Sequence, residues 1–135
     1  MHRLLMAVLF FASAAVMAAD RTIPTSLPEL FKYYSAESGQ APDDKRGKDL
    51  WFRQTLADDG KMRDCTVCHG KDLRQSGKHA KTGKTIDPMA PSVNKERFTD
   101  RAKVEKWFKR NCKWTLGREC TAQEKGDVLK YLSLN

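Results

Sequence analysis

The chain has 135 residues, of which 40% are hydrophobic and 31% charged, and its formal net charge is +8. This length is enough for one small domain with a single core and excludes a multidomain architecture. The excess of lysine and arginine favours encounters with acidic partners through long-range attraction. The lysines are scattered along the sequence, so solvation alone remains the alternative explanation.

The N-terminus has the features of a secretion signal. Arg3 supplies the positive charge, Leu4 to Met17 is apolar or small without any charge, and small residues up to Ala19 offer a cleavage site. An apolar run of about 14 residues is short for a membrane span. We therefore expect residues 1–19 to be a signal peptide, with an uncleaved anchor as the alternative. Residues 20–135 would form one periplasmic domain, with no nucleic-acid partner.

Two helices are expected before the central part of the chain. The first begins at Ser26, which forms a capping box pattern with Glu29, and it ends before Gly39. The second begins around residues 43–44 and stops before Asp58. Both carry apolar residues at helical spacing, so both should bury one face.

The most informative motif is Cys65-Thr66-Val67-Cys68-His69. Two cysteines three positions apart, followed at once by a histidine, are the pattern for covalent attachment of haem c. Each thiol adds to one vinyl group of the porphyrin, and the histidine becomes the proximal iron ligand. A redox CxxC pair or half of a zinc site is the alternative, but neither needs His69. We predict one covalent haem c, attached through Cys65 and Cys68 and ligated by His69.

The segment 70–94 is polar, contains several glycines and prolines, and shows no period. Such a long irregular stretch inside a small domain usually has a function or surrounds a bound group. We expect it to wrap around the edge of the haem. A third helix follows from about residues 99–100 to the cysteine region at residues 112–120, and a fourth begins with a capping box from Thr121 to Glu124. No strand pattern of useful length is visible, so the predicted fold class is all-α.

One face of the third predicted helix contains a candidate for the iron ligand opposite His69. Val104, Trp107, Phe108 and Asn111 have the spacing i, i+3, i+4 and i+7, which places them on one face. The first three are apolar and should point inward, so Asn111 should project toward the core, where an unpaired amide costs about 1–3 kcal/mol. A bond to iron would satisfy this amide. Capping of the helix end would do so equally well.

Two further cysteines, Cys112 and Cys120, remain after haem attachment. In an exported protein two remaining thiols at this spacing should form a disulfide. A zinc site made by all four cysteines is the alternative, although Cys112 and Cys120 lack the close spacing of such sites.

The order of these elements resembles a class I cytochrome c, in which a glycine of an early helix and a glycine and an aromatic residue of the last helix permit a close crossing. Gly47, Gly126 and Tyr131 are the matching positions. The chain further resembles the sphaeroides haem protein family, small periplasmic monohaem cytochromes c. The resemblance extends from about residue 30 to the C-terminus and rests on the segments IDPMAPS (86–92), RFTD (97–100), VEKW (104–107), RNC (110–112) and GRECT (117–121).

This resemblance implies that Asn111 is the sixth iron ligand and that reduction releases it, so that the ferrous iron binds O2, NO or CO. It also implies a monomer that exchanges electrons with a dihaem cytochrome c. Two other functions remain open. Met89 stands where the family can carry leucine, so the first alternative is a conventional electron carrier with His69 and Met89 as iron ligands. The second alternative is a small oxygen or peroxide reductase. Further candidate ligands for the side of the iron opposite His69 are Met62, His79 and Asn94.

Overall fold

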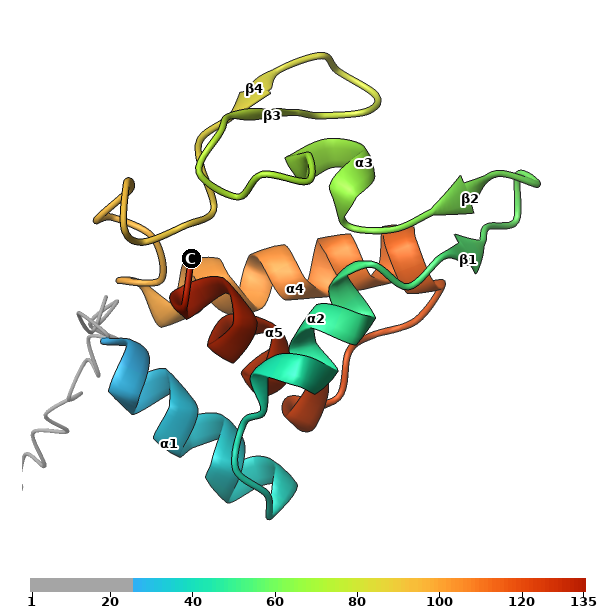
Figure 1. Cartoon of the computed structure of the whole chain (residues 1–135). Coiled ribbons are helices and arrows are strands. Elements are labelled where there is room, and N and C mark those ends of the chain that lie inside the picture. Colours follow the sequence, from blue (N-terminus) through green and yellow to red (C-terminus); the bar gives the residue numbers. More distant parts are fainter. Residues whose placement is uncertain (1–25) are drawn as a thin grey trace, which may run out of the picture.

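The structure is a computed structural model that describes residues 26–135, so the predicted signal peptide lies outside the described residues. The described chain is mostly helical, as predicted (Figure 1). Its helices are α1 Leu27–Ser38, α2 Asp44–Trp51, α3 Thr66–His69, α4 Arg101–Leu116 and α5 Ala122–Ser133. Two short antiparallel hairpins join β1 Thr55–Leu56 to β2 Met62–Arg63 and β3 Gly77–Lys78 to β4 Thr85–Ile86. No helix between residues 26 and 135 is both long and apolar enough to cross a membrane.

The helix ends follow local chemistry, and several match the prediction. Ser26 and Glu29 form the capping box of α1, and Gly39 ends this helix with a φ of 74°, a conformation that suits glycine. Thr121 and Glu124 form the second capping box at the start of α5. Asp100 caps α4 by accepting a hydrogen bond from the backbone nitrogen of Lys103.

Helix α4 ends at Leu116, within the cysteine region as predicted, and Gly117 ends it with a φ of 71°. Two other predictions were wrong. Helix α2 ends at Trp51, because the chain then enters the β1–β2 hairpin instead of continuing as a helix toward Asp58. The segment 70–94 is not wholly irregular, since it contains the β3–β4 hairpin. Each strand has only two residues, which is too short for an alternating pattern to be visible in the sequence.

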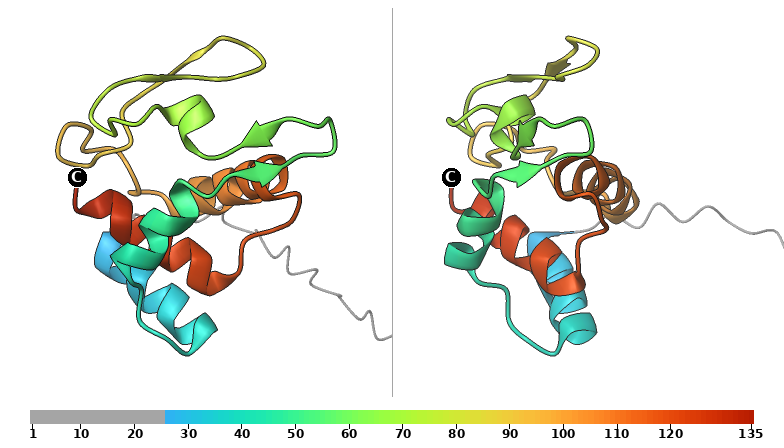
Figure 2. Two further views of the ribbon diagram at one scale, coloured as in Figure 1. Left: turned by 45° about the vertical axis from the view of Figure 1, so that its right-hand side comes forward. Right: turned by 90° about the vertical axis from the view of Figure 1, so that its right-hand side faces the viewer.

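The last helix packs against both of the first two. A Cβ atom at Gly47 of α2 would overlap the backbone carbonyl of Asp127 in α5, so glycine permits the close approach of these helices. Gly126, predicted to share this crossing, packs instead against Tyr34 and Pro42, at α1 and the segment that follows it. In both views of Figure 2 the segment with α3 and the β3–β4 hairpin lies at the opposite end of the molecule from α1.

A buried carboxylate fixes α2 relative to α5. The side chain of Asp127 is almost fully buried and accepts hydrogen bonds from Nε and Nη2 of Arg46, at 2.8 and 3.0 Å, and from the backbone nitrogen of Asp43 at 2.7 Å. A buried charge is tolerated when it is paired and hydrogen-bonded. This cluster holds the start of α2, and therefore Leu50 and Trp51 at its end, in a defined position.

Candidate functional site

The CxxCH motif forms the single turn of α3, and the residue before it fixes its start. Asp64 is buried, and its Oδ1 accepts hydrogen bonds from the Thr66 hydroxyl at 2.6 Å and from the Val67 backbone nitrogen at 3.2 Å. Its other oxygen accepts from the side-chain amide of Gln54. The bond from Val67 satisfies one backbone N–H group at the start of a turn that would otherwise lack a partner.

The β3–β4 hairpin lies directly against this turn. A Cβ atom at Gly77 would overlap the carbonyl of Cys68, so only glycine allows the approach. The backbone nitrogen of Ala80 donates to the Cys68 sulfur at 3.4 Å. At the other end of the loop, the backbone nitrogens of Met89 and Ala90 donate to the carbonyl of Leu73 at 2.9 and 3.0 Å. The segment 70–94 is therefore folded beside the motif and held at both ends.

The four residues predicted to form the site, Cys65, Cys68, His69 and Asn111, all line one cavity of about 590 Å³. This volume is in the usual range for a small-molecule or cofactor site. Residues of α2, the loop 85–98, α4 and α5 complete a mainly apolar wall, and among them are Leu50, Trp51, Met89, Phe98, Val104, Trp107, Phe108, Val128 and Leu132.

The donor groups in this cavity suit a covalent haem. Cys65 and Cys68 are free thiols, and burial raises the pKa of Cys65 to about 12. Burial, and secondarily the charge of Arg97, lowers the pKa of His69 to about 4, so the imidazole is neutral near pH 7, as an iron ligand must be. The His69 Nδ1 is buried without a hydrogen-bond partner among the described residues. Two free thiols and a neutral imidazole beside an apolar cavity are what haem c requires.

Asn111 shares the cavity side of α4 with three apolar residues, as the helical pattern predicts. Val104 is buried, and Trp107 and Phe108 are half-buried. Asn111 lines the same cavity and is an exposed residue. Its position on the cavity wall is what keeps it a candidate ligand.

The other candidate ligands differ in their access to the cavity. Met89 is buried and lines it, and His79 lines it from the exposed hairpin. The Nδ1 of His79 accepts two backbone hydrogen bonds at 3.2 Å, from residues 81 and 82. Met62, 53% exposed, and Asn94 do not line the cavity. Arg97 also lines the cavity, although no sequence pattern distinguishes it from the other lysines and arginines.

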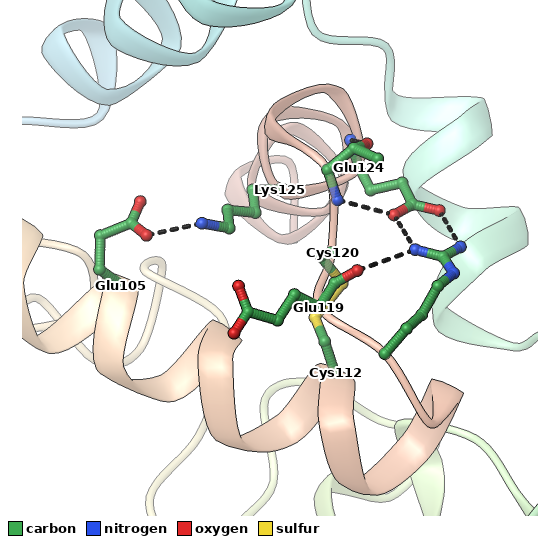
Figure 3. The surroundings of a disulfide bond; sticks show 8 residues. Glu105, Cys112, Glu119, Cys120, Glu124 and Lys125 are labelled. Atoms are coloured by element: carbon green, nitrogen blue, oxygen red, sulfur yellow. Dashed lines mark hydrogen bonds and ion pairs between the residues drawn. A yellow bond between two sulfur atoms is a disulfide. The ribbon is translucent and has the colours of Figure 1, made fainter.

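Cys112 and Cys120 form a disulfide with each other, which removes them as zinc ligands (Figure 3). The bridge joins the last turns of α4 to the residue before the cap of α5. An ion pair of 2.6 Å between Glu105 and Lys125 makes a second connection between the same two helices (Figure 3). The part of α4 that bears Asn111 is therefore anchored to α5 on both sides.

Comparisons with known proteins show what the chain is similar to. Residues 37–132 match a family model described as a domain of unknown function, DUF1924. The chain is 40% identical over 125 residues to the cytochrome c-type protein SHP of Cereibacter sphaeroides, covering 92% of this chain and 96% of that protein. It is also 40% identical over 93 residues to cytochrome c'' of Methylophilus methylotrophus, covering 69% of this chain and 65% of the relative.

Two solved structures of these relatives have a similar fold. The structure of oxidised SHP, described as an oxygen-binding cytochrome c, superimposes with a TM-score of 0.77 at 42% identity and covers 83% of this chain and 99% of SHP. The crystal structure of oxidised cytochrome c'' has a TM-score of 0.70 at 37% identity and covers 78% of this chain and 91% of that one. With its CxxCH motif at the cavity wall, the chain belongs to the sphaeroides haem protein family of c-type cytochromes, which is also the family described as DUF1924.

Proposed function

We propose that this protein is an exported cytochrome c with a class I-like fold around one covalent haem, which binds diatomic gases when reduced and exchanges electrons with another redox protein. The observation that carries the proposal is that Cys65, Cys68, His69 and Asn111, which come from two separate segments, line the same cavity. The likeness to an oxygen-binding relative of nearly the same length supports it. The haem supplies a redox-active iron with room for one ligand opposite the histidine.

The attachment side is assigned to α3. Cys65 and Cys68 hold the porphyrin through thioether bonds, and His69 is the proximal ligand through its neutral imidazole. The hydrogen bonds of Asp64 and the contact with Gly77 fix this turn, which limits the orientation of His69. Groups around a ligating histidine set its orientation and basicity.

The opposite side is assigned to Asn111. A neutral amide is a weak, hard donor that suits ferric iron better than ferrous iron. Asn111 would therefore hold ferric iron only weakly and would leave ferrous iron, and the haem, when bound, would supply a ferrous iron able to bind O2, NO or CO. Among residues 26–135, the Asn111 side chain has no hydrogen-bond partner, so no competing polar group would hold its amide away from the iron. The released amide is then available to donate a hydrogen bond to a bound ligand.

Partner and location follow from the resemblance and from the predicted signal at residues 1–19. The protein acts as a monomer in the periplasm, and its electron partner is a dihaem cytochrome c. The basic net charge of +8 favours an acidic docking surface on this partner.

A second candidate function is that of a conventional electron carrier with Met89 as the permanent sixth ligand. It is favoured by one observation, that Met89 is 8% exposed and lines the same cavity. In the gas-binding proposal Met89 is instead an apolar residue that packs against the haem, which its flexible side chain suits. Turnover of oxygen with an artificial reductant would identify the third possibility, a small reductase.

The substitution Asn111→Ala tests the proposal. The ferric variant should be five-coordinate or water-ligated and should bind azide or imidazole more readily than the wild type. Association of CO with the ferrous protein should change much less, because Asn111 has already left the iron. Release of O2 or autoxidation should be faster, since a hydrogen bond of about 1 kcal/mol is lost. Asn94→Ala is the matched control, because Asn94 does not line the cavity. If azide binding and the ferric spectrum are both unchanged, Asn111 is not a ligand of the iron.

A further inference from the structure

Arg97, between the loop 85–94 and α4, is a partly buried arginine in the wall of the cavity. Its Nε donates to the carbonyl of Pro88 at 2.8 Å, and its Nη2 donates to the carbonyl of Asp87. The guanidinium lies 5.1 Å from the centroid of the Trp107 ring, which also lines the cavity. Two carbonyls and an aromatic ring therefore hold the guanidinium in place.

The charge of Arg97 lacks a closely placed counterion. Six ion pairs occur among residues 26–135, and none of them includes Arg97. Burial lowers the pKa of Arg97, whereas the charge of Asp87 raises it by less. The other cations that line the cavity, Lys81 and Arg110, are exposed and remain solvated. A partly buried charge is costly unless it is paired, so Arg97 is suited to an anionic group inside the cavity.

The remaining hydrogen-bond donors of Arg97 also suit an anionic group inside the cavity. A guanidinium has five N–H donors in a planar arrangement that matches a carboxylate. Two of the five are used by the carbonyls of Asp87 and Pro88, which leaves three. A haem carries two propionate carboxylates, which are the only anionic groups that it would bring into this apolar cavity.

We propose that Arg97 binds a propionate carboxylate of the haem and that its fixed charge favours the reduced state of the iron. This inference rests on the proposed function, because it requires haem c in the cavity. A nearby cation stabilises the state that has one positive charge fewer. Since the reduced state is the one assigned to gas binding, Arg97 sets how much of the protein is competent to bind gas at a given ambient potential.

The test compares midpoint potentials of the holoprotein. Arg97→Gln should lower the equilibrium constant for reduction about tenfold, which is about 59 mV for one electron. This is the effect of a unit charge roughly 12 Å from a redox centre at an effective dielectric constant of about 20. Arg97→Lys keeps the charge and should remain within about twofold of the wild type. Arg74→Gln is the matched control, because Arg74 is an exposed arginine of the segment 70–94 that does not line the cavity.

If Arg97→Gln shifts the potential no more than Arg74→Gln while the haem stays attached, the proposal is wrong and Arg97 only ties the loop to Trp107. If the Arg97→Gln protein does not accumulate, resonance Raman spectra of the wild type and of Arg97→Lys test whether Arg97 binds a propionate. The propionate bending band should differ between them, and an unchanged band would overturn the proposal. Absence of covalent haem from the wild type, seen by haem staining after denaturing electrophoresis, would instead refute the proposed function.

Discussion

Gly47→Ala should destabilise the protein, because Gly47 lies where α2 meets α5. The new methyl group would overlap the carbonyl carbon and oxygen of Asp127 and would lie 3.0 Å from the Cβ of Tyr131. These are backbone and Cβ atoms, which cannot rotate away, so the two helices must separate. At a solvent-exposed position inside a helix, replacing glycine by alanine would stabilise the protein by about 1 kcal/mol. Overpacking typically costs about 1–3 kcal/mol, and a clash with backbone belongs at the upper end. The expected net loss is about 2 kcal/mol.

For a domain of this size, a loss of about 2 kcal/mol lowers Tm by about 6–12 °C. Thermal unfolding of the holoprotein, followed by far-ultraviolet circular dichroism, measures the change. Gly126→Ala should cost less than half as much, because its methyl group would lie 3.2 Å from Pro42 Cγ and Tyr34 Cβ, contacts that small shifts relieve. Lys48→Ala, exposed on α2, should have little effect. A Gly47→Ala protein as stable as the wild type would refute the close crossing of α2 and α5.

Three further outcomes are expected. Replacing Cys65 and Cys68 together by alanine should give a colourless, largely unfolded product, because the cavity of about 590 Å³ would lose the group that fills it; recovery of a compact apoprotein would contradict this. Met89→Leu roughly conserves volume, so it should cost less than about 1.5 kcal/mol and leave the ferric spectrum unchanged, whereas loss of a methionine charge-transfer band would establish the carrier function. Replacing Cys112 and Cys120 by serine should lower the free energy of unfolding by about 2–3 kcal/mol in denaturant titrations, as expected for so short a ring, and an unchanged value would show that the bridge adds no stability.

The features that the sequence predicted well are those determined by local chemistry. Both capping boxes depend on residues three positions apart, and the structure confirms them at Ser26 and Thr121. The CxxCH motif and the apolar face of α4 are likewise local patterns. The four residues predicted to share one face of α4 do line the cavity, because helical periodicity fixes which side chains share a face. The pattern did not select Arg110 and Thr115, which line it as well.

The features that it missed depend on contacts between distant segments. The apolar residues after Trp51 read as more helix, but pairing of Thr55 with Arg63 redirects the chain. Gly126 read as a partner of Gly47, yet it packs toward Tyr34, which no local pattern reveals. Arg97 resembles any other surface arginine until its backbone partners in the loop are known. The exposure of Asn111 is also tertiary information, because the helical period gives a direction but not a depth.

The position of α5 has a consequence for how the protein matures. The cavity is closed by α2 and by α5, which stand near opposite ends of the described chain (Figure 1). In the export that we propose, the motif at residues 65–69 would leave a secretion channel before residues 122–133 could fold against α2. Contacts so far apart in sequence form late, since a long loop must close first. During this interval a haem could reach both thiols while the cavity still lacks the side of its wall that α5 supplies. Docking of α5 would then place Val128 and Leu132 against the haem, so the order of the chain favours attachment before the wall is complete.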